Sequence, residues 1–376
     1  MTEKIRVGVI FGGRSGEHEV AVRSARSVIE AIDRDRYEVV PLAISKDGRW
    51  LSPAASAGLL PEETRPFLPA RVKESEASLT IVGDPSRAGL HRLEGGDGVE
   101  RPRLDVVFPV LHGTYGEDGT IQGLLEMAGV PYVGCGVLAS SCGMDKVTMK
   151  VLFKEARLPV CKYVWFLRSE WERDPGAVAQ RVAGELGFPC FVKPANLGSS
   201  VGISRAKDAD SLADAISLAA RYDRKIIVEE GLDVREIECA VMGNEEPEAS
   251  LPGEYVVHDE QAKFLDYTEK YSKTGHVEFV TPAPIPKRLS ERIRRLAVTA
   301  FKAVDGSGLA RVDFFLRRDN GKLLVNELNT IPGLTDVSGF PQMWEASGRP
   351  FPQVIDRLIE LAFERHRDKS RNVTSL

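Results

Sequence analysis

Two carboxylates near the end of the chain are brought face to face by the pattern around them. Residues 311–329, RVDFFLRRDNGKLLVNELN, form two alternating strands around the turn Asp319-Asn320-Gly321. A three-residue loop centred on Asn320 fixes the register, and side chains alternate between the two faces. The pattern predicts one face with Arg311 opposite Asn329 and Asp313 opposite Glu327. The other face then carries a core surface of Val312, Phe314, Leu316, Leu324 and Leu328.

The opposed carboxylates call for a cation. Their Cβ atoms would lie about 5 Å apart, and unit charges at that distance repel by roughly 3 kcal/mol at an effective dielectric of about 20. Arg311 alone would neutralise part of this charge, which leaves a solvated surface pair as one interpretation. With the amide oxygen of Asn329, however, Asp313 and Glu327 make an all-oxygen set of the kind that Mg²⁺ prefers when it is shared with phosphates. The spacing alone leaves both interpretations open.

A loop rich in small residues indicates where phosphate would bind. Residues 193–205, KPANLGSSVGISR, place two glycines and two serines between strand-like runs, which is more than a chain reversal needs. Glycines allow close backbone approach, and amides and hydroxyls donate to anionic oxygens. A flexible connector is the alternative. The Walker pattern G-x-x-x-x-G-K-[ST] does not occur in the sequence.

The elements that position these residues follow an α/β pattern. A buried-type strand at 5–13 precedes helical spacing from Glu17, and a strand at 105–113 precedes a polar loop, a helix and a strand at 130–134. Ligands of open parallel sheets bind at the carboxyl ends of the strands, here 12–19 and 112–119. We expect three domains, an N-terminal α/β domain at 1–143, a central α+β domain at 144–243, and a C-terminal domain at 244–376 that begins with a long polar stretch. A connection of this length is usually a functional lid or a disordered segment. Residues 53–103 read as an insertion with one or two short strands.

Composition narrows the functional classes. The formal net charge of −5 over 376 residues argues against a nucleic-acid partner. No apolar run reaches membrane-spanning length, and the N-terminus lacks a signal-peptide core, so we expect a cytoplasmic protein without a membrane partner. The five cysteines are expected to be free thiols.

Several stretches together resemble one family. GGRSGEHEVAVRSA, HGTYGEDGTIQG, MDKVTMK, FVKPANLGSSVGI, RVDFF and NELNTIPGLT occur in the order found in D-alanine:D-alanine ligases, which belong to the ATP-grasp superfamily. The resemblance spans nearly the whole chain except residues 53–103 and the tail. It implies an ATP-grasp fold, in which two α+β domains hold ATP between antiparallel sheets beside an open, mostly parallel α/β domain. It also implies a cytoplasmic enzyme of peptidoglycan precursor synthesis that is commonly a homodimer.

The resemblance also implies roles for individual residues. ATP would be bound by phosphate cations, by the small-residue loop and by the adenine and ribose side of the site. Mg²⁺, or Mn²⁺ in its place, would be held by the hairpin carboxylates and amide. The implied ATP set is Lys146, Lys193, Lys270, Ser200, Val201, Glu229, Glu230, Leu232 and Glu236, and the implied metal set is Asp313, Glu327 and Asn329.

The remaining roles concern D-alanine. Glu17 would pair with the ammonium of the first D-alanine, and His112 would lie near its carboxylate. Arg311 and the Gly333 amide would stabilise the tetrahedral oxyanion, a contribution of about 3 to 4 kcal/mol per donor. The second carboxylate would be held by Ser338 and Gly339, and the site would be shut by a hydrogen-bonded set of Glu17, Ser199 and Tyr271.

Three alternatives are weighed against dipeptide synthesis. A D-alanine:D-lactate ligase would share the fold, but related enzymes of that type lack the lid tyrosine that is present here as Tyr271. A nicotinamide-dependent oxidoreductase would need glycine at 11, where Phe11 stands in FGGRSG. A binding protein without chemistry would not need the combination of Arg311, Asp313 and Glu327.

Overall fold

The N-terminal unit is a three-stranded parallel sheet in the order β2-β1-β5. The computed structural model describes residues 3–70, 79–87, 90–92, 104–198, 201–257 and 277–373. Strand β1 pairs with β2 and β5 over apolar runs that are buried on both faces. The expected strand at 130–134 is reduced to a single bridge between Val107 and Tyr132. The unit contains β1 (Ile5–Gly12), α1 (His18–Ala31), β2 (Tyr37–Ile44), α2 (Pro53–Leu59), η1 (Arg65–Phe67), β3 (Leu79–Ile81), η2 (Pro85–Arg87), β4 (Leu90–Arg92), β5 (Val106–Val110) and α4 (Thr120–Ala128).

The insertion expected at 53–103 is partly described. Its described part holds the helix α2 and the antiparallel pair β3 and β4, in line with the one or two short strands predicted there.

All five cysteines are free thiols, as predicted.

The central unit is a four-stranded antiparallel sheet in the order β6-β9-β7-β8. Helix α6 begins at Lys146 because the Asp145 side chain accepts hydrogen bonds from the amides of Val147 and Thr148, at 3.0 and 2.9 Å. Helices α8 and α9 bury their apolar sides in the core of this sheet. The elements are α5 (Val137–Met144), α6 (Lys146–Glu155), β6 (Tyr163–Leu167), α7 (Arg168–Arg173), α8 (Pro175–Glu185), β7 (Cys190–Pro194), β8 (Ser204–Ala206), α9 (Ala209–Tyr222) and β9 (Lys225–Glu230).

The C-terminal unit is built on an antiparallel sheet in the order β13-β12-β10-β14-β15, with β11 paired to β10. We expected β10 in the central domain, but it pairs along its whole length with β14. The expected boundary at 243 therefore falls after a strand that belongs to the C-terminal sheet. The elements are β10 (Val234–Gly243), β11 (Glu248–Ala249), β12 (Gly253–Val257), β13 (Val277–Val280), α11 (Lys287–Ala303), β14 (Gly308–Arg317), β15 (Leu323–Asn329), α12 (Gly339–Ala346) and α13 (Phe351–Lys369).

The β14–β15 hairpin matches the predicted register at one end only. Asp313 lies opposite Glu327 and Arg311 opposite Asn329, as predicted, but a bulge after Asp313 shifts the pairing near the turn by one residue. Leu324 therefore lies opposite Phe315 rather than on the core face, and our placement of Leu324 was wrong. The positions that complete the core face of β15 are Leu323, Val325 and Leu328.

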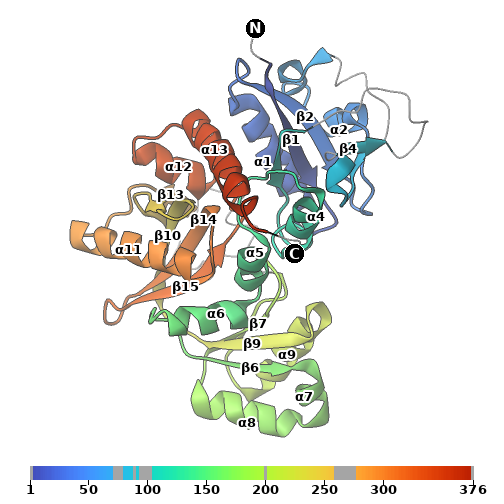
Figure 1. Ribbon diagram of the computed structural model, residues 1–376. Coiled ribbons are helices and arrows are strands. Elements are labelled where there is room, and N and C mark those ends of the chain that lie inside the picture. The colour runs from blue at the N-terminus through green and yellow to red at the C-terminus, as the bar shows by residue number, and fades with distance from the viewer. Residues whose placement is uncertain are drawn as a thin grey trace.

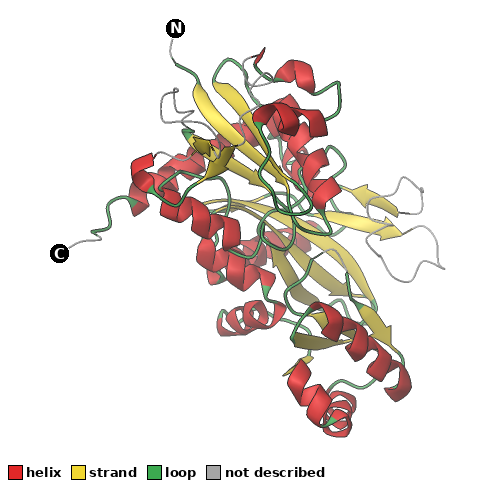
Figure 2. Cartoon of the chain, turned by 90° about the vertical axis from the view of Figure 1, so that its right-hand side faces the viewer, coloured by secondary structure: helices red, strands yellow, loops and turns green. Residues whose placement is uncertain are grey.

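In Figure 1 the N-terminal unit lies at the top right, the central unit at the bottom, and the C-terminal unit between them on the left. One apolar core contains residues of the N-terminal sheet, of α12 and α13, and of β10 and β14 in the C-terminal sheet. Helix α13 packs on elements of both sheets. Figure 2 shows helices flanking the sheets of the successive units. In the described ranges, no helix combines the length and the apolar character required to cross a bilayer.

Candidate active site

The inner face of the β14–β15 hairpin carries a paired cluster of charges. The Arg311 guanidinium binds both oxygens of Asp313 at 2.7 Å, in the bidentate geometry that makes such pairs strong. It also lies 3.2 Å from Glu238 Oε1 on the neighbouring strand β10. Burial alone would lower the pKa of Arg311, but these two carboxylates raise it well above its ordinary value. Arg311 is therefore a fixed cation held between two strands.

The same face offers oxygen ligands suited to a hard cation. The Asn329 amide donates to Asp313 Oδ2 at 3.0 Å, and Glu327 Oε2 lies 3.7 Å from the Lys146 ammonium. The positive charges near these carboxylates include Arg311 and Lys146. The ligand atoms that Asp313, Glu327 and Asn329 can offer to a cation are all oxygens. Among the described residues, no group of three or more His, Cys, Asp or Glu side chains is arranged to hold a metal. The set fits Mg²⁺ as a site of few protein ligands that leaves other positions to phosphate oxygens and water.

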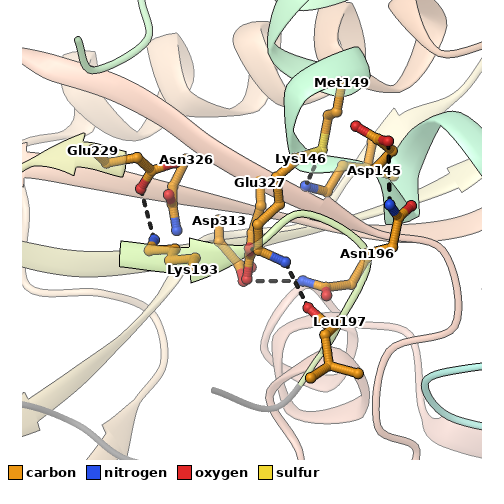
Figure 3. Close-up of polar contacts among 12 residues, drawn as sticks. Asp145, Lys146, Met149, Lys193, Asn196, Leu197, Glu229, Asp313, Asn326 and Glu327 are labelled. Atoms are coloured by element: carbon orange, nitrogen blue, oxygen red, sulfur yellow. Dashed lines mark hydrogen bonds and ion pairs between the residues drawn. The ribbon is translucent and has the colours of Figure 1, made fainter. Parts of the chain in front are cut away.

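Two of the predicted phosphate cations point into the space between the central and C-terminal sheets. Figure 3 shows Lys146 at the start of α6 with its ammonium 2.8 Å from the carbonyl of Leu197, beside Glu327. Lys193, on β7, donates to Glu229 Oε2 at 2.6 Å. The fold thus brings Lys146 of helix α6 to Glu327 of the C-terminal sheet, whereas Lys193 is paired with Glu229 of its own sheet.

The adenine-side residues have different surroundings. The Glu229 side chain is buried and engaged by lysines, so only its backbone remains to contact a base. Glu230 Oε1 accepts from the Lys162 amide at 2.7 Å. Leu232 lies in the link between β9 and β10, and Glu236 lies on β10 opposite Phe315. The four positions therefore lie on the end of β9, on the link and on the start of β10, where the chain passes from the central sheet to the C-terminal sheet.

Glu17 of the N-terminal unit lies beside Gly198 of the small-residue loop. A Cβ atom at Gly198 would lie 3.0 Å from Glu17 Oε2, and one at Gly113 would lie 2.6 Å from it. Glu17 directly precedes α1, yet its side chain makes no capping hydrogen bond, so it does not act as a helix cap. The carboxylate instead lies between two loops that belong to different units. Val201 in the small-residue loop is exposed, whereas Ser199, Ser200, Lys270 and Tyr271 lie outside the described residues.

His112 is buried and hydrogen-bonded through both ring nitrogens. Nδ1 lies 2.9 Å from the Ile331 carbonyl, and Nε2 lies 3.1 Å from Ser24 Oγ. Burial lowers the pKa of His112, so the ring is neutral at pH 7. A neutral imidazole held in this way fixes the loop after β5 to the segment after β15.

Glu117 is a candidate that the sequence interpretation missed. Its carboxyl accepts from the Gly113 amide at 2.7 Å and from the Ile331 amide at 3.3 Å. Burial, followed by the nearby charge of Glu17, raises the pKa of Glu117 to about 8. A carboxyl perturbed to this extent next to Glu17 is typical of functional sites. The signal was present in the HGTYGEDG stretch, but periodicity gave no reason to choose this acid over its neighbour Asp118.

The expected second-carboxylate site is the start of α12. Ser338 is buried, and its hydroxyl lies 2.7 Å from Thr335 Oγ1 and accepts from the Thr335 amide at 3.1 Å. A Cβ atom at Gly339 would lie 2.6 Å from Glu238 Oε2 and 2.8 Å from Phe279 Cζ, so a larger residue there would displace these side chains. Gly333 is buried in the segment between β15 and α12. The start of α12 therefore lies beside the Glu238 and Arg311 pair.

Comparisons with known proteins agree with this geometry. The sequence profile described as "D-ala D-ala ligase C-terminus" matches residues 152–360, and the profile described as "D-ala D-ala ligase N-terminus" matches residues 6–135. The chain belongs to the D-alanine–D-alanine ligase family. A D-alanine--D-alanine ligase of Heliobacterium modesticaldum is 46% identical over 372 residues, which is 99% of this chain and 98% of the relative.

Solved structures of the family share the fold. A D-alanine-D-alanine ligase of Coxiella burnetii superposes with a TM-score of 0.81 at 36% identity and covers 98% of this chain and 97% of its own. A D-Ala:D-Ser ligase of Enterococcus faecalis gives a TM-score of 0.82 at 35% identity, with 96% of this chain and all of its own covered. The ATP-grasp fold predicted from the sequence is confirmed.

Proposed function

We propose that the protein joins two D-alanine molecules into D-alanyl-D-alanine, with hydrolysis of ATP to ADP and phosphate, for peptidoglycan precursor synthesis. The observation that carries this assignment is the convergence of two sets of residues. Arg311, Asp313, Glu327 and Asn329 lie on the C-terminal sheet, and they face Lys146 on helix α6 and Lys193 on the central sheet. Both sets are needed when a phosphoryl group is moved and an oxyanion then forms.

The reaction has two chemical steps. The carboxylate of the first D-alanine attacks the γ-phosphorus of ATP, which gives D-alanyl phosphate and ADP. The amine of the second D-alanine, after loss of a proton, attacks the acyl carbon, and phosphate leaves. Lys146 and Lys193 neutralise the phosphates, and Arg311 donates to the oxygen that becomes negative in the second step. A Mg²⁺ ion held by Asp313, Glu327 and Asn329 would neutralise charge on the phosphates.

The N-terminal unit supplies recognition of the first D-alanine. Glu17 lies beside Gly113 and Gly198, where its carboxylate accepts hydrogen bonds from the ammonium of the first D-alanine. Glu117, largely protonated at pH 7 because of its raised pKa, adds no second full charge to that pocket. Ser338 and the Gly339 amide face the second carboxylate at the start of α12. Ser199 and Tyr271 would join Glu17 in the set that closes the site, and Lys270 and Ser200 would add phosphate contacts.

The activity is tested by incubating the protein with ATP, Mg²⁺ and D-alanine and measuring phosphate release and dipeptide formation. D-lactate and D-serine serve as alternative acceptors, because one of the similar structures is a D-Ala:D-Ser ligase. We expect D-alanine to be the preferred acceptor. An absence of D-alanine-dependent phosphate release would contradict the assignment, and efficient use of either alternative acceptor would change the second substrate.

We further propose that the enzyme acts as a homodimer in the cytoplasm. The family resemblance supports the dimer, and the requirement for ATP supports the compartment. A native mass close to 41.3 kDa, the mass of one chain, would contradict the dimer.

A further inference from the structure

Lys150 is a buried lysine that none of the expected roles uses. It lies one turn after Lys146 on α6, and its residue is only 1% exposed. Its ammonium lies 3.0 Å from Glu229 Oε1 on β9 and donates to the Asn326 carbonyl on β15 at 3.0 Å. Lys150 therefore connects both antiparallel sheets from a helix that lies between them.

The other oxygen of Glu229 is taken by Lys193, at 2.6 Å. Glu229 thus bridges two ammonium groups, of which Lys193 is the more exposed, at 9% against 1%. Burial alone would raise the pKa of Glu229, but the charges of Lys150 and Lys193 lower it to about 2. Burial alone would lower the pKa of Lys150, but the Glu229 charge raises it. All three groups are therefore charged at pH 7.

The charges of this cluster do not cancel. Two ammonium groups and one carboxylate leave one net positive charge. Without Lys150, the Glu229 carboxylate would neutralise Lys193 completely, and the pair would present no net charge to an anion. Interactions of this kind are strong because water does not screen buried charges as it does exposed ones.

The second contact of Lys150 concerns the hairpin. Asn326 lies within the bulge of β15, next to Glu327, as Figure 3 shows. A bulge leaves backbone groups without ladder partners. By binding the Asn326 carbonyl, Lys150 holds the segment that orients Glu327.

We propose that Lys150 is a positioning residue for the triphosphate: it balances Glu229 so that Lys193 keeps its charge for phosphate, and it fixes the bulge that carries Glu327. This inference rests on the proposed ATP-dependent function. It predicts that Lys150 acts through charge, so its loss should be compensated by removal of the Glu229 charge.

The test compares the affinities of the full-length protein for ATP with Mg²⁺ and for adenosine by calorimetry. The variants are Lys150→Met, the double variant Lys150→Met with Glu229→Gln, and Lys154→Met as a control on an exposed lysine of the same helix. For Lys150→Met we expect the Kd for ATP to rise about tenfold, with little change for adenosine. The double variant restores one net positive charge, so its Kd for ATP should return to within about threefold of the unmodified protein.

The outcomes separate charge from packing. Equal losses of ATP and adenosine affinity in Lys150→Met, or a double variant no better than the single one, would overturn the inference. If Lys150→Met does not fold, the double variant decides, because a folded double variant with weak ATP binding would also contradict it. Unchanged ATP affinity in Lys150→Met overturns this inference alone, whereas an unmodified protein that does not bind ATP overturns the proposed function as well.

Discussion

Replacing Glu327 by glutamine should remove activity while leaving the fold nearly as stable as before. The change removes a charge that is repelled by Asp313 across the hairpin and attracted by Lys146 at 3.7 Å. At an effective dielectric of about 20, the repulsion at about 5 Å is roughly 3 kcal/mol and the attraction roughly 4 kcal/mol. The two nearly cancel, so the free energy of unfolding should change by only about 1 kcal/mol.

Activity should respond quite differently. Glutamine keeps the shape of the side chain but loses the negative charge that a cation and the phosphates require. We expect kcat to fall on the order of a hundredfold or more, measured as D-alanine-dependent phosphate release. Glu291→Gln, an exposed acid on α11, is the matched control and should behave like the unmodified protein.

Two results would refute this reasoning. Normal turnover by Glu327→Gln would mean that the inner face of the hairpin is not the catalytic face. A loss of more than about 3 kcal/mol in urea unfolding would mean that the Lys146 contact outweighs the Asp313 repulsion by far more than the roughly 1 kcal/mol calculated above.

Three further predictions follow from the site. The pKa of Glu117 is raised to about 8, so between pH 6.5 and 8 the native state holds a proton that the unfolded state has lost, and the free energy of unfolding should fall by roughly 2 kcal/mol across that window in urea titrations. Gly113→Ala should raise the KM for D-alanine more than that for ATP, because the new Cβ would meet Glu17 Oε2 at a φ of +75°. Glu238→Gln should lower kcat about tenfold or more by loosening Arg311, which lies 3.2 Å away, while the affinity for ATP measured by calorimetry stays unchanged.

Each of these has a clear contrary result. The pH slope should disappear in Glu117→Gln, and a slope that persists there would assign the titration to another group. Equal effects of Gly113→Ala on both substrates would indicate a general disturbance of the fold. A Glu238→Gln variant with normal kcat would show that Asp313 alone is enough to hold Arg311.

The sequence predicted which residues of the hairpin face each other at Asp313 and Glu327, but not the pairing register near the turn. The pairing of Asp313 with Glu327 is correct, although the register near the turn is shifted, because a bulge inserts one extra residue. The alternating pattern of the sequence does not reveal this bulge, so Leu324 was assigned to the wrong face. The error was confined to the end of the hairpin near the turn, away from the pair of Asp313 and Glu327.

The features that could not be predicted depend on contacts between distant segments. Strand β10 has the composition of any buried strand, and only its pairing with β14 places it in the C-terminal sheet. Glu117 and Lys150 look like ordinary surface residues in the sequence, because charged residues are seldom buried. Only contacts between distant segments bury Lys150 beside Glu229 and half-bury Glu117 beside Glu17.

The most direct test of the central claim is quantitative detection of D-alanyl-D-alanine made from ATP and D-alanine. We predict one dipeptide formed for each phosphate released, and loss of both products in Glu327→Gln with the fold intact. Phosphate release without dipeptide, or dipeptide synthesis that survives Glu327→Gln, would contradict the account.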